Sequence, residues 1–202
     1  MFQVWIHRTM RVLRINPFKP ERKLILEVID SLNNREIIIY PTDTVYGIGC
    51  RIIDLDSVRK IFEIKKRHLN KPLSIACSDL EMVKRYAILN KEDERFIRER
   101  IDKPFTFVVK KKTSVDDLIT SKKDTVGIRL PPLKIVREII ESVNCPIITT
   151  SANTAGRKAP STVNEIENEI LNAVDLVIDS GRCRIGKPST VIDVRTKRII
   201  RD

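Results

Sequence analysis

The stretch FTFVVKKKTSVDDLITSKKDTVGIRL, residues 105–130, predicts two strands with no regular helix between them. Phe105–Lys110 and Thr125–Leu130 are rich in β-branched and aromatic residues, and an irregular polar segment joins them. Parallel neighbours need a long crossover, usually a helix, whereas antiparallel neighbours do not. We therefore expect an α/β fold whose twisted sheet is mixed rather than wholly parallel.

Hydrophobic periodicity on either side of this stretch predicts the other elements. Helices are expected at Pro20–Asn33, Leu55–Lys66, Lys91–Arg100 and Pro132–Val143. Strands are expected at Met10–Ile15, Glu36–Tyr40, Leu73–Cys77, Pro146–Thr150, Leu176–Asp179, Thr190–Asp193 and Arg198–Arg201. Ser78-Asp-Leu-Glu81 and Thr162-Val-Asn-Glu165 match the capping box, so each is expected to open a further helix.

The composition is that of one globular domain with a basic surface. The 202 residues are 42% hydrophobic and 32% charged, and they contain no internal repeat or Gly/Ser linker. Lys and Arg number 38 against 27 Asp and Glu, a net charge of +11. A surplus of this size favours polyanionic partners such as RNA or nucleotides.

Several classes of protein and site are excluded by what the sequence lacks. No apolar run approaches the roughly 20 residues of a membrane helix. The four cysteines are dispersed without C-x-x-C spacing, and there are two histidines, so a structural zinc site is not expected. Reduced thiols without a secretory signal indicate the cytoplasm. No Ser-His-Asp or Cys-His nucleophile stands out.

Two glycine patterns imitate nucleotide-binding motifs. Gly181–Lys187 has G-x-x-x-x-G-K spacing, but Pro188 follows where Ser or Thr is required, and a strand is predicted next. Gly47 and Gly49 lack the third glycine of a dinucleotide-binding loop. We reject both motifs.

Cationic and hydroxyl side chains cluster in the predicted loops, namely Lys65, Lys66, Arg67 and Lys71 after one helix, Arg129 at a strand end, Thr149–Asn153 after another strand, and Ser189 with Thr190 before a third. If these strand ends converge, they surround a pocket with positive charge and neutral donors. Such a pocket suits a nucleoside triphosphate and a carboxylate, with catalysis by positioning and charge stabilisation. The alternative is a solvated basic face.

Five separated motifs resemble, in order, those of the YrdC-type threonylcarbamoyl-AMP synthase family: YPTDTVYGIGC (40–50), KKRHLNKPLSI (65–75), TVGIRLP (125–131), TTSANTAGRKAPST (149–162) and PSTVIDV (188–194). The resemblance covers 10–201. It implies a single YrdC/RibB-like domain over 10–202, with helices flanking the mixed sheet and a concave basic cavity. Met1–Thr9 have no counterpart and are expected to be an extension with little role in catalysis.

The resemblance also implies an activity. Family members are nucleotidyltransferases that convert ATP, L-threonine and bicarbonate to threonylcarbamoyl-AMP and pyrophosphate. The product supplies the threonylcarbamoyl group that a Kae1/TsaD-type transferase places on tRNA next to the anticodon. Mg²⁺ is expected with the nucleotide, and no residue is assigned as its ligand; Asp43 stays unassigned.

The family's site residues transfer by motif. Lys65 and Arg67 match the pair that faces the ATP phosphates and are the expected catalytic residues. The positions implied for ATP binding are Arg67, Lys71, Thr125, Ser151, Asn153, Ala159 and Arg201. Those implied for L-threonine are Thr44, Arg129, Thr149 and Ser189, with Arg129 as the partner of the carboxylate. Ala159 replaces a frequent serine, so its contact is expected through the backbone.

Two other readings stay open. A non-catalytic RNA-binding protein, such as a tRNA or rRNA factor, would use the basic cavity for RNA alone. A carbamoyl-transfer module acting on a protein, as related domains do in hydrogenase-maturation enzymes, would sit in a much longer chain. Pyrophosphate release from ATP that requires both threonine and bicarbonate separates these readings from the synthase.

Overall fold

The computed structural model describes residues 10–202, and the expected extension Met1–Thr9 lies outside them. The strands of the described chain are β1 Arg11–Arg14, β2 Ile38–Tyr40, β3 Gly47–Gly49, β4 Ser74–Ala76, β5 Ala87–Ile88, β6 Phe105–Lys111, β7 Thr125–Arg129, β8 Ile147–Ser151, β9 Leu176–Asp179, β10 Thr190–Asp193 and β11 Ile199–Arg201. The helices are α1 Arg22–Asn33, α2 Leu55–Ile64, α3 Leu80–Tyr86, α4 Lys91–Arg98, α5 Asp117–Thr120, α6 Lys134–Ser142 and α7 Asn168–Leu171, with a 3₁₀ turn at Val163–Glu165.

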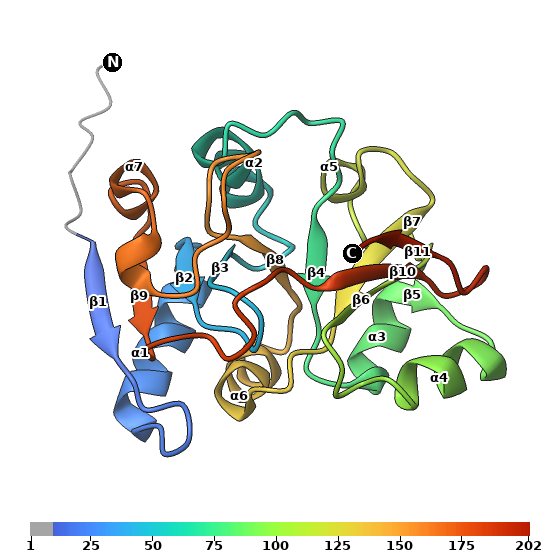
Figure 1. The fold of residues 1–202 in the computed structure, drawn as a ribbon, viewed down its shortest axis with the longest axis horizontal. Helices are drawn as coiled ribbons and strands as arrows, with labels where there is room; N and C mark the ends of the chain where they lie inside the picture. Colours follow the sequence, from blue (N-terminus) through green and yellow to red (C-terminus); the bar gives the residue numbers. More distant parts are fainter. Residues whose placement is uncertain (1–9) are drawn as a thin grey trace.

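The strands form one mixed sheet in the order β1-β9-β2-β3-β8-β4-β7-β6-β10-β11, with β5 paired to β6 (Figure 1). The pairs β1–β9, β2–β9, β4–β7 and β6–β10 are parallel. The pair β6–β7 is antiparallel, as the polar connection between these strands predicted. The expectation of a mixed sheet is therefore confirmed.

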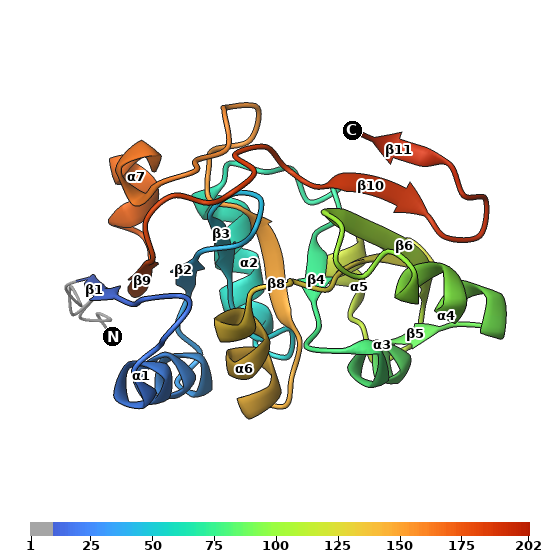
Figure 2. The same ribbon diagram turned by 60° about the horizontal axis from the view of Figure 1, so that its bottom comes forward.

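The helices cover the sheet with their apolar sides. Ile25, Val28 and Leu32 are buried in α1 at helical spacing, and α6 buries four aliphatic residues and contacts α1. Figure 2 shows α1, α6, α3 and α4 on one side of the bent sheet and α7 on the other, with β10 and β11 forming one end of the sheet. No helix among residues 10–202 is long and apolar enough to cross a membrane.

Side-chain alternation gives the central strands two different faces. In β7, Val126 and Ile128 are buried in the core, whereas Thr125, Gly127 and Arg129 point to the opposite face. In β6, alternate side chains likewise lie in the core, and those between them lie on the same face of the sheet as Thr125. Pairing register places Ser74 of β4 opposite both Gly127 of β7 and Thr149 of β8. The hydroxyl side chains of separate strands are thus brought together on one face.

Some local expectations were wrong. The N-cap of α3 is Asp79, whose side chain accepts from the backbone N–H of Met82, so the expected Ser78–Glu81 capping box does not form. Thr162 makes no side-chain cap, because Glu165 instead accepts from the backbone N–H and the hydroxyl of Ser161. The capping box that does form is Asn90–Asp93 at the start of α4.

The segment between the expected strand Glu36–Tyr40 and the expected helix Leu55–Lys66, for which no element was predicted, contains β3, Gly47–Gly49. Glycines weaken strand propensity, which is why the sequence pattern does not reveal this strand. The structure supplies the reason for Gly49: a Cβ there would lie 2.1 Å from the carbonyl oxygen of Ile148 on the neighbouring β8.

Candidate active site

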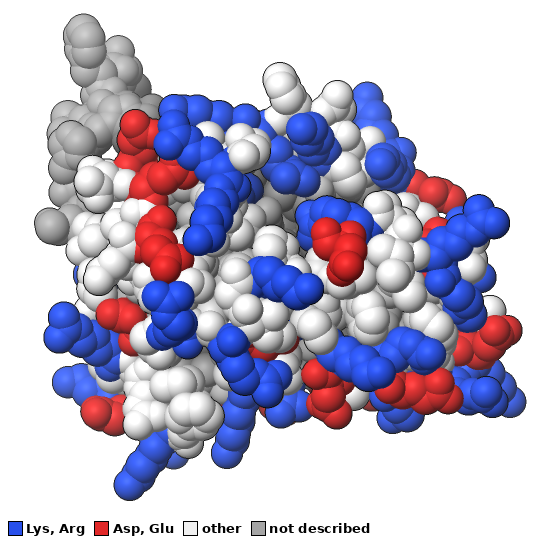
Figure 3. Space-filling model, viewed as in Figure 1, with Lys and Arg blue, Asp and Glu red and all other residues white. Residues whose placement is uncertain are grey.

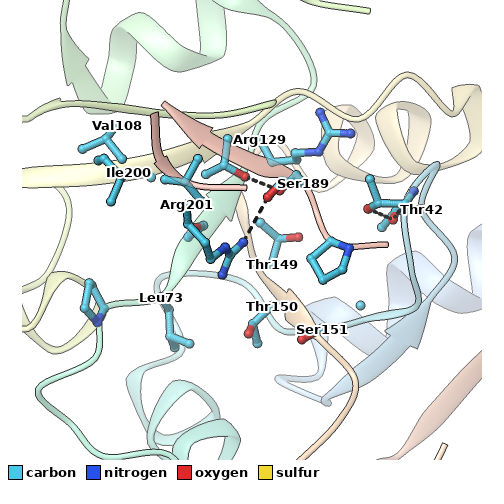
Figure 4. Close-up of a pocket in the computed structure, with 18 of the residues that line it drawn as sticks. Thr42, Leu73, Val108, Arg129, Thr149, Thr150, Ser151, Ser189, Ile200 and Arg201 are labelled. Carbon is cyan, nitrogen blue, oxygen red and sulfur yellow. Dashed lines mark hydrogen bonds between the residues drawn. The ribbon is translucent and has the colours of Figure 1, made fainter. Parts of the chain in front are cut away.

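A cavity of about 410 Å³ opens on the hydroxyl-bearing face of the central strands. Its size lies within the usual range for small-molecule sites. Its walls come from the Thr42–Gly47 turn, the segment before β4, strands β6, β7 and β8, and the C-terminal hairpin. In Figure 4, Val108 and Ile200 lie at one end and Thr42 at the other, with Thr149, Thr150 and Ser151 along one wall. The cavity therefore has a partly apolar end and a hydroxyl-rich end.

The hydroxyl-rich end is built on the turn after β2. The Thr42 hydroxyl accepts from the backbone N–H groups of Thr44 and Val45 and lies 2.8 Å from the Thr44 hydroxyl. Backbone bonds join this turn to the segment before β10, since Ile185 and Gly186 donate to the carbonyls of Asp43 and Thr44. The turn is held from both sides and presents Thr44 in a fixed position.

Serine and threonine side chains supply most of the polar groups in the cavity. The lining hydroxyl residues are Thr42, Thr44, Ser74, Thr106, Thr125, Thr149, Thr150, Ser151 and Ser189. The Ser189 and Thr106 hydroxyls lie 2.7 Å apart and link β10 to β6. Hydroxyl groups both donate and accept, so this wall can contact either an anion or an amine.

Positive charge in the cavity comes from Arg67, Lys123, Arg129 and Arg201, whereas Asp193 is the one acidic residue among the described lining residues. Figure 4 shows the Arg201 side chain reaching into the middle of the cavity, and it donates to the carbonyl of Ser189 at 3.1 Å. Figure 3 shows more Lys and Arg side chains along the upper edge of this face, over the segment between α2 and β4.

The surroundings of Arg67 disfavour its positive charge. Its guanidinium donates to the carbonyls of Lys71 at 3.0 Å and Pro72 at 2.8 Å, which fixes the side chain. Burial lowers the pKa of Arg67 below its ordinary value, and the nearby positive charge of Arg201 lowers it further. An anion between these guanidinium groups would relieve both effects.

Arg129 is paired inside the protein. Its Nη2 lies 2.6 Å from both carboxylate oxygens of Asp43, and Nη1 donates to the carbonyls of Lys103 and Phe105. Arg129 lines the cavity, but these contacts use both of its Nη groups. The expected pairing of Arg129 with a substrate carboxylate is therefore limited to the Nε–H, the donor left without a partner among the described residues.

Lys65 does not lie among the cavity-lining residues, although the resemblance placed it against the phosphates. Its side chain is 1% exposed, and Nζ donates to the backbone carbonyls of Ser151 and Asn153. The direct phosphate contact expected for Lys65 is thus not the arrangement found. Arg67, two residues later, does reach the cavity.

The end of α2 explains why Lys65 and Arg67 point in different directions. Lys66 has a φ of 48°, the left-handed region, and the N–H groups of Lys66 and Arg67 bond to the carbonyls of Glu63 and Phe62. This is the Schellman motif, with a lysine where glycine is usual. The helix therefore ends at Ile64, with Lys65 as its C-cap, two residues before the expected end at Lys66.

The other expected residues divide into two groups. Thr44, Thr125, Thr149, Ser151, Ser189 and Arg201 line the cavity. Lys71, Asn153 and Ala159 do not: Lys71 is exposed, Ala159 is partly buried, and the Asn153 amide donates to the carbonyls of Thr154 and Arg157.

Several lining residues were missed in the sequence, including Ser74, Thr106, Lys123 and Asp193. A signal for Thr106 existed: it is a threonine that alternates with apolar residues in a predicted strand. Alternation reveals that such a residue lies on the less apolar face, but not what that face surrounds.

The cysteines and the acidic residues offer no second chemistry. All four cysteines are buried and free, and burial raises the pKa of the Cys183 thiol to about 11. Residues 10–202 contain no group of three His, Cys, Asp or Glu side chains placed to hold a metal ion. The cavity therefore suits binding and charge stabilisation rather than a thiolate nucleophile.

Comparison with known proteins gives consistent matches over almost the whole chain. The Sua5/YciO/YrdC family model, described as telomere recombination, matches residues 30–202. A Methanocaldococcus jannaschii protein provisionally named threonylcarbamoyl-AMP synthase is 39% identical over 195 residues, which cover 96% of this chain and 91% of that protein. The Pyrococcus abyssi threonylcarbamoyl-AMP synthase is 34% identical over 160 residues, 79% of this chain and 47% of that protein.

Two solved structures have the same fold. Escherichia coli YciO superposes with a TM-score of 0.88 at 27% identity, covering 96% of both chains. Pyrococcus abyssi Sua5, solved in complex with L-threonine, gives a TM-score of 0.82 at 30% identity. That match covers 92% of this chain and 54% of Sua5, so the chain spans about half the length of the Pyrococcus protein.

Proposed function

The chain belongs to the Sua5/YciO/YrdC family, and from this premise we propose that it is an L-threonylcarbamoyladenylate synthase. The observation that supports this most directly is the cavity of about 410 Å³, in which Arg67 and Arg201 face a wall of serine and threonine hydroxyls. Relatives named threonylcarbamoyl-AMP synthase cover most of the chain, and a related structure binds L-threonine.

The proposed reaction is a nucleotidyl transfer. The amine of L-threonine combines with bicarbonate to give a carbamate and water. A carbamate oxygen then forms a bond to the α-phosphorus of ATP while the bond to the β-phosphate oxygen breaks, which releases pyrophosphate. Both the nucleophile and the leaving group are anions, so the reaction needs fixed positive charge more than an acid or a base.

The cationic residues are proposed to bind the nucleotide. Arg67 and Arg201 are expected to contact the phosphates, because burial and the nearby charge of Arg201 lower the pKa of Arg67 and an anion would stabilise its charged form. Thr125 and Ser151 contribute hydroxyls on the strands beneath them. The apolar end of the cavity, with Val108 and Ile200, suits the flat face of a purine (Figure 4). Contacts from Lys71, Asn153 and Ala159 would require a shift of the loops that hold them.

The hydroxyl-rich end is proposed to bind L-threonine. Thr44, Thr149 and Ser189 come from three separate elements and surround a space suited to a small polar amino acid. Arg129 lies in the same wall and is proposed to attract the carboxylate with its charge and its Nε–H, while Asp43 holds Nη2 and two backbone carbonyls hold Nη1.

A protein-held magnesium ion does not fit the residues present. Mg²⁺ is usually bound by one or two carboxylates together with phosphates. Asp193 is the one lining carboxylate described, and its Oδ1 already accepts from the N–H groups of Arg195 and Thr196. We therefore assign no catalytic step to a metal and expect any magnesium to arrive with ATP.

The biological context follows as a further part of the proposal. The net charge of +11 and the cationic edge of the cavity support RNA contact near the site. We propose that the product serves threonylcarbamoyl modification of tRNA, through a Kae1/TsaD-type transferase acting downstream in the cytoplasm.

One assay tests the function. Purified protein is incubated with ATP, and pyrophosphate release is measured with threonine and bicarbonate present together, then with each omitted. Release that requires both substrates is expected. If no release occurs but tRNA is bound, the protein is instead the RNA-binding factor considered above.

A further inference from the structure

Lys65 is a buried lysine whose partners are all uncharged. It is 1% exposed, and Nζ donates to the carbonyl of Asn153 at 2.7 Å and to the carbonyl of Ser151 at shorter range. The described residues give it no ion pair with a carboxylate. Burying an ammonium group without a counter-charge costs free energy. We therefore expect the two hydrogen bonds to have a role in holding the segment that carries these carbonyls.

The contact between α2 and the segment after β8 is reciprocal. Lys65 donates from its side chain to the Ser151 and Asn153 carbonyls, and its own carbonyl accepts from the N–H of Ala155 at 2.8 Å. Three hydrogen bonds therefore join the C-terminal end of α2 to three residues of the 151–155 segment. This segment begins with Ser151, which lines the cavity.

The same segment is also held by Glu167, which precedes α7. Its carboxylate accepts from the N–H of Thr154 at 2.7 Å and pairs with Arg157 at 3.3 Å. Lys65 and Glu167 therefore both bond to the backbone of this segment. Asn153 Oδ1, which is buried, has no hydrogen-bond partner in the structure.

From these contacts we propose that Lys65 is a positioning residue: its ammonium group holds the backbone of Ser151 and Asn153 and so fixes the Ser151 hydroxyl in the cavity, without touching the substrates. The left-handed Lys66 makes this possible, because it directs Lys65 into the protein and Arg67 into the cavity. Burial is the main cause that lowers the pKa of Lys65 to about 7. This agrees with a side chain that is enclosed by protein and does not face the phosphates of a substrate.

The inference rests on the proposed synthase activity for its kinetic test, so it also needs a measurement that does not depend on activity. Lys65→Met removes the donors, and Lys65→Gln keeps two N–H donors without the charge. Lys111→Met is the control, since Lys111 also donates to a backbone carbonyl, that of Val115, and its partners, Val115 and Asp117, lie outside the 151–155 segment. Hydrogen exchange at the amides of residues 152–155 is compared in all of them.

We expect Lys65→Met to increase exchange at the Ala155 amide at least tenfold, Lys65→Gln to restore part of the protection, and Lys111→Met to leave it unchanged. Unchanged exchange in a folded Lys65→Met protein would overturn the proposal. Should Lys65→Met fail to fold, the comparison of Lys65→Gln with wild type decides the same point.

A double-mutant cycle then separates positioning from direct phosphate contact. If Lys65 acts through Ser151, then Lys65→Met and Ser151→Ala overlap, and the double variant loses little more kcat/KM than the worse single variant. Lys65→Met and Arg67→Ala should multiply instead. The reverse pattern, with Lys65→Gln as inactive as Lys65→Met, would assign Lys65 to the phosphates. A wild-type protein without pyrophosphate release would refute the synthase proposal while leaving the exchange result valid.

Discussion

Arg129 and Asp43, separated by 86 positions in the sequence, form an ion pair in which Nη2 lies 2.6 Å from each carboxylate oxygen. The two side chains are 5% and 3% exposed. Nη1 of Arg129 also donates to the carbonyls of Lys103 and Phe105. Arg129 thus joins the start of β6 and the end of β7 to the turn after β2, which carries Thr44 of the proposed threonine site.

Replacing Arg129 by lysine is expected to impair threonine use selectively. Lysine keeps the charge but loses the planar fork that reaches Asp43 and two carbonyls together. We expect the threonine KM to rise at least tenfold while the ATP KM changes less than threefold, measured by pyrophosphate release. Equal increases in the two KM values would move Arg129 to the nucleotide.

Replacing Asp43 by asparagine is expected to destabilise the fold. The Arg129 guanidinium would remain buried without a counter-charge, a situation that costs roughly 3–5 kcal/mol. Chemical denaturation gives the free energy of unfolding. Asp54→Asn is the control, because Asp54 pairs with Arg51, whose side chain is more exposed at 16%. A smaller loss for Asp43→Asn than for Asp54→Asn would contradict the structural role given to the pair.

Arg67→Ala is expected to separate catalysis from general attraction to RNA. Loss of a preorganised charge at a reacting phosphate lowers turnover by about 10²–10³-fold, by analogy with loss of one oxyanion donor. Removing one surface charge changes RNA affinity only a fewfold. Arg98→Ala on α4 and Lys91→Ala at its start, both exposed, are the controls and should leave turnover intact. If all three variants weaken RNA binding alike and none alters turnover, the proposed active site is wrong.

Lys66→Gly is expected to stabilise the protein by about 1 kcal/mol, because glycine adopts the left-handed region without steric conflict. The surface pair between Lys66 and Glu169, at 3.6 Å with both side chains mostly exposed, contributes little to stability. Thermal unfolding measures the change, with Asn144→Gly as a comparison, since Asn144 also has positive φ but tolerates it better. If Lys66→Gly is less stable than wild type while its turnover is unaltered, the lysine side chain stabilises the fold by more than its left-handed backbone conformation destabilises it.

The burial of Lys65 predicts a pH-dependent stability. Burial, and then the nearby charge of Arg67, lower its pKa from 10.5 to about 7, while Glu167 acts in the opposite direction. Between these pH values the unfolded chain binds the additional proton, so the free energy of unfolding rises with pH. The burial penalty is full below pH 7 and disappears as pH rises toward 10.5.

The contributions of other titrating groups to the free energy of unfolding cancel when wild type is compared with Lys65→Met. Relative to that variant, the wild-type free energy of unfolding should increase by roughly 2 kcal/mol between pH 6 and pH 9. Urea denaturation at the two pH values provides the measurement. A constant difference across this range would mean that Lys65 stays protonated in the folded protein.

Much of the fold could be predicted because its elements have clear periodicity. The apolar spacing in α1 and α6, and the alternation in β6 and β7, place each element within a few residues of its observed bounds. The strand Gly47–Gly49 was missed, and the N-cap of α3 was misplaced by one residue, since it is Asp79. In both cases the controlling contact is a specific hydrogen bond or a close backbone approach, which periodicity does not report.

The site was predicted in outline for a similar reason. Thr44, Arg67, Thr125, Thr149, Ser151, Ser189 and Arg201, which belong to the motifs or to the final strand, do meet in one cavity. Lys71 and Asn153 belong to the same motifs but do not line the cavity: Lys71 is exposed, and the Asn153 amide donates to backbone carbonyls. Adjacency in a motif establishes that residues are near each other, but not which way each side chain turns.

By itself, the sequence determined the α/β class, the mixed sheet and the charged and hydroxyl residues of the site, because local periodicity and residue chemistry suffice for these. Only the tertiary structure decided that Arg129 pairs with Asp43 and that Lys65 turns inward to the carbonyls of Ser151 and Asn153. The partners in these contacts lie 86 to 88 positions apart. Such contacts depend on strand order and register, which place distant residues within hydrogen-bond range and leave no local pattern in the chain.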